Sequence, residues 1–181
     1  MNLTTNYIVS QILIIIMYVF LASSYLIKNR KIILSVNIFA TIINSVAYIL
    51  LNAYTGLFMC IVALIRNLCF LIDEKKNGKR DVLNKKDIVI LFVIIIIATF
   101  STVFTYDGFY SLLAFLATVI YTYSVCQKKT SIYKILGIPT GILWMLYNFW
   151  IKSIFGFILE AILLIFSTTG YIWELKLNKK R

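Results

Sequence analysis

Long apolar blocks, separated by short polar connections, run through the whole chain of 181 residues. A helix crosses a hydrocarbon core of about 30 Å with about 17–25 residues. The blocks have that length and are continuously apolar, as at residues 88–97, whereas the strands of a β-barrel alternate apolar and polar side chains. The pattern predicts seven membrane-spanning helices, at about residues 7–27, 32–51, 54–72, 88–104, 109–126, 135–150 and 153–173.

The composition excludes an ordinary soluble domain. Hydrophobic residues make up 61% of the chain and charged residues 14%, whereas about a quarter of the residues in a soluble domain are charged. The predicted fold class is therefore an all-α, polytopic membrane protein whose surroundings are a lipid bilayer.

The basic residues indicate how the chain is oriented in the membrane. The connections after the first, third, fifth and seventh blocks carry 3, 6, 3 and 4 Lys or Arg residues, and the opposite side carries Lys152 alone. Because basic residues collect on the cytoplasmic side, the N-terminus is predicted outside and the C-terminus in the cytoplasm of a bacterial inner (plasma) membrane. Topology and anionic lipid account for the net charge of +11, so no nucleic-acid partner is expected.

A weak internal repeat relates the first three blocks to the last three. Three helices invert the chain, so a single linker helix between two such units restores their orientation and predicts a parallel 3+1+3 repeat, with a site at the midplane between the halves. A shift of 96 residues pairs Tyr48 with Trp144 and Asn52 with Asn148, and a further one-residue gap pairs Ala63 with Glu160.

The predicted units follow from these blocks. They are a first three-helix unit at 1–72, a cytoplasmic basic loop at 73–87, a linker helix at 88–107, a second three-helix unit at 108–173 and a cytoplasmic basic tail at 174–181.

Two ionisable residues lie inside apolar blocks, where such groups face protein or water and often mark function. Glu160 is about seven residues into the last block, near midplane. It is interpreted either as a group that binds a polar solute or carries a proton, or as a structural acid. Arg66 lies nearer the cytoplasmic side. Its alternatives are a role in a ligand site or gate, and snorkelling to the interface.

Several further residues are candidates for the same site. Trp144 and Tyr48 either stack on a solute or pack in the core, and Asn148 and Asn52 either line the site or cap equivalent helix ends. Pro139 is predicted to kink its helix and to act as a hinge. Asn37 and Asn44 are seven residues apart, so they share a helix face that we expect to look into the bundle.

Catalysis finds little support in the residues. The chain has no histidine, which removes the commonest metal ligand and general base. The aspartates fall in predicted loops or turns, and the three cysteines, Cys60, Cys69 and Cys126, have no metal-ligand spacing. We expect no enzyme activity, no metal site and no cofactor.

Two segments resemble a known family. The C-terminal segment LWMLYNFWIKSIFGFILEAILLI and the earlier segment AYILLNAYTGLFMCIVALIRN, which ends with Arg66 and Asn67, resemble the signatures of the YgjV family of bacterial inner membrane proteins. That family looks like a distant relative of the SWEET, SemiSWEET and PQ-loop (MtN3-like) transporters. The resemblance implies their three-helix units and places Trp144 and Glu160 in the substrate pocket, with Glu160 where those transporters have asparagine.

The expected function is the movement of a small polar solute, such as a sugar, nucleoside or vitamin, by alternating access around Trp144 and Glu160. The alternative is a non-transporting receptor or accessory subunit on the same fold, which would use its basic loop to bind a partner. The sequence is compatible with a homo-oligomer and does not identify one.

Overall fold

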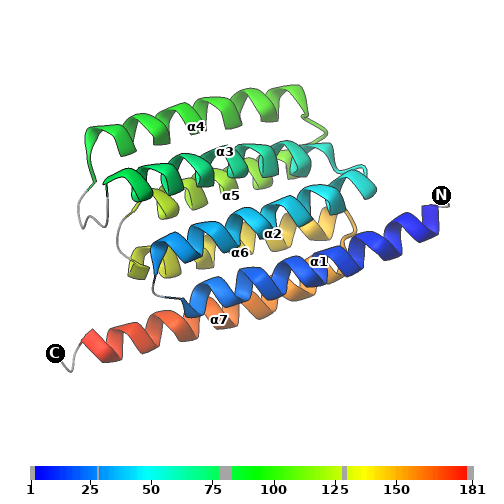
Figure 1. The fold of residues 1–181 in the computed structure, drawn as a ribbon. Coiled ribbons are helices and arrows are strands. Elements are labelled where there is room, and N and C mark those ends of the chain that lie inside the picture. Colours follow the sequence, from blue (N-terminus) through cyan, green and yellow to red (C-terminus); the bar gives the residue numbers. More distant parts are fainter. Residues whose placement is uncertain (1–2, 28, 78–82, 128–129, 179–181) are drawn as a thin grey trace.

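A computed structural model of the chain describes residues 3–27, 29–77, 83–127 and 130–178. These residues form seven α-helices and no strand. Their bounds are α1 Leu3–Leu26, α2 Arg30–Leu50, α3 Tyr54–Asn77, α4 Lys85–Phe104, α5 Phe109–Cys126, α6 Thr130–Trp150 and α7 Ile154–Asn178 (Figure 1).

The helices have the length and composition that a membrane requires. Within the described residues, α1 to α5 are long and apolar enough to cross a bilayer, and α7 contains a shorter apolar stretch, Ile154–Thr169. The all-α fold class of a polytopic membrane protein is therefore confirmed. After its first two residues, Lys85 and Lys86, the large side chains of α4 that point outward are apolar, among them Val89, Phe92 and Phe100, as expected where lipid surrounds a helix.

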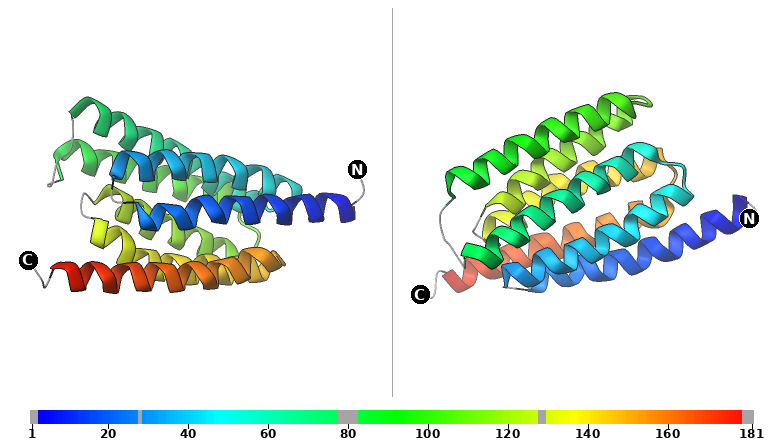
Figure 2. Two further views of the ribbon diagram at one scale, coloured as in Figure 1. Left: turned by 60° about the horizontal axis from the view of Figure 1, so that its bottom comes forward. Right: turned by 45° about the horizontal axis from the view of Figure 1, so that its top comes forward.

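Six helices close into a ring. Each contacts the next in the order α1, α2, α3, α5, α6, α7, and α7 returns to α1. The remaining helix, α4, lies outside the ring against α3 and α5 (Figures 1 and 2). Successive helices alternate in direction, so the connections after α1, α3 and α5 lie at the same end of the bundle as the end of α7 (Figure 1). We call this the C-terminal end; the described residues of the predicted basic connections lie there.

The interior of the ring is polar by the standard of a soluble core. Buried side chains within it include Gln11, Asn37, Arg66, Thr118 and Glu160. Because lipid cannot satisfy polar groups, such residues face the bundle and hydrogen-bond to one another. The predicted inward face of α2 is confirmed, since Asn37 is 2% exposed and both Asn37 and Asn44 line the interior cavity described below.

The predicted loop at 73–87 is shorter in the structure, and residues 78–82 lie outside the described part. Helix α3 continues to Asn77, and α4 begins at Lys85. Asp73 and Asp87 are thus helical, and the expectation that the aspartates fall in loops or turns is wrong for these two. The reason at α4 is a capping box, in which the Asn84 side chain accepts from the Asp87 N–H and the Asp87 carboxylate accepts from the Asn84 N–H.

The turns after α2 and α6 have the same geometry, 100 residues apart. Leu51 N–H bonds to the Ala47 carbonyl and Ala53 N–H to that of Tyr48, and residues 151 and 153 bond to 147 and 148 in the same way. Asn52 and Lys152 both have positive φ, 54° and 57°.

This geometry overturns one prediction about the site. Asn52 lies in a turn, whereas Asn148 lies inside α6, so the two do not occupy equivalent helix ends. The shift of 96 residues, which pairs Asn52 with Asn148, therefore differs by one helical turn from the shift of 100 that relates the two turns. It does so because the position with positive φ is an asparagine in the first turn and a lysine in the second. By the turn geometry, Asn148 is level with Tyr48, and Glu160 is level with Cys60.

Candidate functional site

A cavity of about 100 Å³ lies inside the ring and is lined by side chains from all six ring helices. Since a water molecule needs about 10–15 Å³ of such volume, the cavity has room for several waters or for one small solute. Its polar and aromatic lining includes Tyr18, Asn37, Tyr48, Arg66, Trp144 and Glu160. Helix α5 adds Thr118 and Tyr121.

Glu160 is held at the cavity wall by the first helix of the chain. The Tyr18 hydroxyl donates a 2.8 Å hydrogen bond to Glu160 Oε1, and Asn148 Nδ2 lies 3.5 Å from that hydroxyl as a donor. The second carboxylate oxygen lies over Gly141, where a Cβ would be 3.3 Å away. Among the described residues, no basic side chain forms a salt bridge with Glu160. The carboxylate is oriented by a hydroxyl and carries no counter-charge.

Arg66 is buried on α3, with 1% of its surface exposed, so it does not snorkel to the interface. Its Nε donates to Asn67 Oδ1 at 3.1 Å, its Nη1 donates to Thr122 Oγ1 at 3.2 Å, and its guanidinium lies 4.7 Å from the ring centre of Tyr121. These partners are uncharged. Within the described residues Arg66 makes no ion pair, and the remaining guanidinium nitrogen, Nη2, makes no hydrogen bond.

Aromatic rings from α2 and α6 meet inside the ring of helices. Tyr48 on α2 and Trp144 on α6 are stacked, with ring centres 6.4 Å apart and planes at 23°. Tyr147 packs edge-on against both, and its hydroxyl accepts a 2.8 Å hydrogen bond from the Gly56 N–H. The Gly56 N–H belongs to the first turn of α3, where no helical acceptor exists. Tyr147 therefore ties α6 to the start of α3.

A second polar network closes the cavity around Asn37. Its Nδ2 donates to the Tyr121 hydroxyl at 3.0 Å and lies 3.3 Å from that of Tyr133. The two tyrosine hydroxyls are 2.8 Å apart, and Ser24 Oγ lies 3.2 Å from Tyr133. Asn37 Oδ1 is buried and has no hydrogen-bond partner in the described structure. The network thus leaves one buried acceptor of a cavity-lining residue without a hydrogen bond.

The structure brings four of the predicted site residues together. Tyr48, Arg66, Trp144 and Glu160 all line the cavity. Asn148 is not in the lining and reaches the site through Tyr18. Asn52 is separate from it, in the turn after α2.

Pro139 lies inside α6. It has no N–H, so the helix lacks one hydrogen bond there. Its role as a hinge stays a prediction.

Sequence reasoning missed the tyrosines that complete the site. Tyr18, Tyr25 and Tyr121 line the cavity and are not exposed to lipid as typical aromatic anchors are. A tyrosine inside an apolar block fits either a lipid interface or a protein interior. Only the contact between α1 and α7 places Tyr18 beside Glu160.

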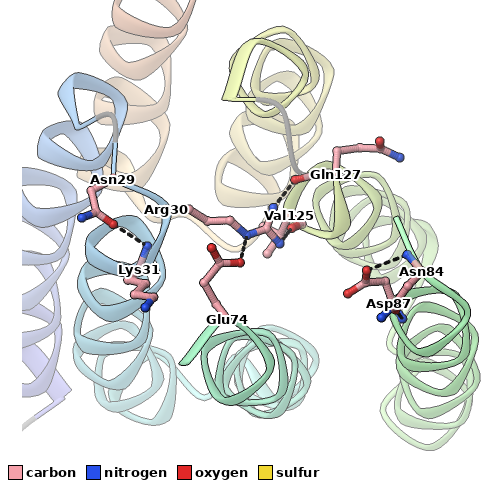
Figure 3. A network of polar contacts seen from close by, with 8 residues as sticks. All are labelled: Asn29, Arg30, Lys31, Glu74, Asn84, Asp87, Val125 and Gln127. Carbon is pink, nitrogen blue, oxygen red and sulfur yellow. Dashed lines mark hydrogen bonds and ion pairs between the residues drawn. The ribbon is translucent and has the colours of Figure 1, made fainter. Parts of the chain in front are cut away.

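An ionic cluster joins three helices at the C-terminal end of the bundle (Figure 3). Arg30, the first residue of α2, pairs with Glu74 of α3, with Nε and Oε2 3.4 Å apart. It also donates to the backbone carbonyls of Val125, at 2.7 Å, and Gln127, at the end of α5. The last carbonyls of a helix have no helical donor, so Arg30 satisfies two of them while binding a buried carboxylate.

We searched the described residues for a metal-binding cluster. In the described part of the chain, no group of three or more His, Cys, Asp or Glu side chains could hold a metal ion.

Comparison with known proteins assigns the chain to a family. A model of the family Imp-YgjV, described as bacterial inner membrane protein, matches residues 8–177. No curated protein and no solved structure matches the chain. The matched segment covers all seven helices almost completely, and it confirms the predicted family and location. The chain belongs to the YgjV family and is a multi-pass protein of the bacterial inner membrane.

Proposed function

We propose that this protein moves a small polar solute across the inner membrane by alternating access, using the cavity inside the ring as the binding site. The observation that carries this proposal is the polar lining of that cavity. Glu160 and Arg66 line it without a salt bridge among the described residues, and Asn37 Oδ1 is buried there without a hydrogen-bond partner. Buried polar groups without partners are unfavourable, so their retention here favours a polar occupant.

The helix arrangement supports a moving-halves mechanism. In this proposal, α1–α3 and α5–α7 are two parallel three-helix units, as in the SWEET and PQ-loop transporters that the sequence resembles, and α4 is the linker. The turn geometry that recurs after 100 residues and the outer position of α4 agree with such a repeat. The basic connections gather at one end, which the positive-inside rule assigns to the cytoplasm.

Two kinds of contact would alternate as the halves rock. At the C-terminal end, Arg30 of the first half, which is paired with Glu74, donates to the end of α5 in the second half. At the opposite end, Gln11 Oε1 accepts from the Phe155 N–H, and Thr55 Oγ1 lies 3.3 Å from Ser111 Oγ. Each set joins one half to the other near one mouth of the cavity. Opening one end requires the contacts of that end to break.

A ligand screen tests the proposal. The full chain, purified in detergent, is heated with sugars, nucleosides, vitamins and amino compounds, because a ligand that binds only the folded state raises the unfolding temperature. The proposal expects at least one solute to raise the unfolding temperature of the wild type and to lose this effect in Trp144→Ala. If no solute stabilises a folded protein, the receptor or accessory function replaces the transporter.

A further inference from the structure

The charges inside the cavity point to a class of solute. Resting on the proposed function, we infer that the solute is a small zwitterion, whose anionic group binds Arg66 and whose ammonium group binds Glu160. The cavity lining holds one cationic side chain, from α3, and one anionic side chain, from α7. Within the described structure these two charges are not paired with each other or with any third charge.

Unpaired buried charges favour a ligand that supplies both missing partners. A charge inside a protein is unfavourable unless a counter-charge and hydrogen bonds surround it. A sugar or nucleoside would leave both charges without a counter-charge. A simple anion would compensate Arg66 and leave Glu160, and a simple cation would do the reverse. A zwitterion compensates both charges with one molecule and adds no net charge to the membrane interior.

The Arg66 end of the cavity is built to receive an anion. Asn67 and Thr122 hold the guanidinium through Nε and Nη1, and the Tyr121 ring covers one of its faces. The remaining nitrogen, Nη2, has no hydrogen-bond partner among the described residues. A guanidinium fixed in this way offers planar N–H donors, the geometry that a carboxylate accepts.

The Glu160 end is built to receive a cation. Tyr18 occupies Oε1, and no described residue donates to Oε2, which lies over the small residue Gly141. The stacked rings of Tyr48 and Trp144 line the same cavity. Tryptophan and tyrosine faces attract ammonium groups and quaternary ammonium groups above all.

The two ends lie at different depths. Arg66 is 12 positions after the first residue of α3, Tyr54, and Glu160 is 6 positions after the first residue of α7, Ile154. Both helices start at the same end of the bundle, after turns of the same geometry (Figure 1). At a rise of 1.5 Å per residue, the backbone positions of Arg66 and Glu160 differ by about 9 Å along the bundle. Solutes with different separations between their two charges therefore need to be compared.

The experiment is a series of matched ligands on the full-length protein in detergent, with the unfolding temperature as readout. The zwitterions are glycine, β-alanine, 4-aminobutyrate, 6-aminohexanoate and glycine betaine. Each is compared with the acid that lacks its nitrogen and with the amine that lacks its carboxylate. Sucrose and uridine represent neutral solutes. The inference expects at least one zwitterion to stabilise the wild type while its two single-charge analogues do not.

Two charge variants are then expected to change which ligand of a matched series stabilises the protein. Glu160→Gln is expected to weaken the response to that zwitterion about tenfold or more and to strengthen the response to the matched acid, because Arg66 becomes the only charge. Arg66→Gln is expected to favour the matched amine instead. Ile158→Val and Ile65→Val, on the same helices and exposed toward lipid, serve as controls that leave the wild-type preference unchanged.

The outcomes distinguish failure of the zwitterion site from failure of the transport function. Stabilisation by a neutral solute that Trp144→Ala abolishes would overturn the zwitterion and leave the proposed transport function standing. Equal responses to a zwitterion and its single-charge analogues would also overturn it. No response to any compound would count against the solute site itself. The ligand series on the wild-type protein tests the zwitterion inference even if a charge variant does not fold.

Discussion

Tyr18 of α1 donates a 2.8 Å hydrogen bond to Glu160 of α7, across 142 residues of sequence. This bond closes the ring of helices where its first and last members meet, and it orients the one carboxylate that the described residues contribute to the cavity lining. The same hydrogen bond therefore holds α1 against α7 and fixes the position of Glu160 in the site.

Loss of the Tyr18 hydroxyl should destabilise the protein. Hydrogen bonds to charged groups contribute about 1.5–3 kcal/mol, so Tyr18→Phe is expected to lower the free energy of unfolding by about that amount. Unfolding by SDS in mixed micelles measures it. Tyr7→Phe is the control on the same helix, since its hydroxyl makes an exposed 3.3 Å bond to the Lys152 carbonyl. Equal effects of the two variants would contradict the role assigned to Tyr18.

Gly56 and Tyr147 should be energetically coupled. A Cβ on Gly56 would lie 2.8 Å from the Tyr147 hydroxyl oxygen and 3.0 Å from the Tyr48 ring. Gly56→Ala is therefore expected to be destabilising, and Tyr147→Phe to lose about 1–3 kcal/mol because the Gly56 N–H loses its acceptor. The double variant should lose less than the sum, since the alanine displaces the hydroxyl that phenylalanine lacks. Strict additivity in a double-mutant cycle would contradict this contact.

The ionic cluster at the C-terminal end should behave as a unit. Arg30→Met leaves the Glu74 carboxylate and two helix-end carbonyls without their donor, and breaking a buried pair costs about 3–5 kcal/mol. Adding Glu74→Gln to Arg30→Met should restore part of that loss, because the buried charge is gone. Lys75→Met, at an exposed position of α3, should change stability by less than about 0.5 kcal/mol. Unfolding free energies of the four proteins test the prediction, and a double variant no more stable than Arg30→Met would refute it.

Gly141 should control access to Glu160. A Cβ there would lie 2.9 Å from Leu164 Cδ2 and 3.3 Å from Glu160 Oε2. Because the Leu164 side chain can move, Gly141→Ala is expected to fold, to fill part of the cavity and to reduce the thermal shift that a bound solute produces. Ile142→Ala, one residue on and exposed toward lipid, should retain the full shift. A full shift in Gly141→Ala would place the solute elsewhere.

Much of the fold could be predicted from the apolar blocks. A block of about 20 apolar residues has few alternatives to a spanning helix, and an ionisable residue within it must face the bundle. This logic identified Glu160 and Arg66, and both line the cavity. Trp144 and Tyr48 were placed with them by the resemblance and the shift of the repeat.

The partners of these residues could not be predicted in the same way. Tyr18 reaches Glu160 only because α1 and α7 become neighbours when the ring closes, and the sequence carries no local signal of that contact. The register of the repeat failed for a related reason. The residue with positive φ is Asn52 in the turn after α2 and Lys152 in the turn after α6. Pairing Asn52 with Asn148 by residue type therefore aligned positions that lie one helical turn apart.

Access to the cavity from both sides of the membrane is the central claim, and it can be measured without knowing the solute. In a variant whose native cysteines are replaced by alanine, Thr41→Cys puts a thiol in the cavity lining, and Ile96→Cys puts one on the exposed face of α4. A membrane-impermeant thiol reagent is applied to right-side-out and to inside-out vesicles. Alternating access predicts that residue 41 is labelled in both preparations and residue 96 in neither. Labelling of residue 41 from one side only, or from neither, would contradict transport through this cavity.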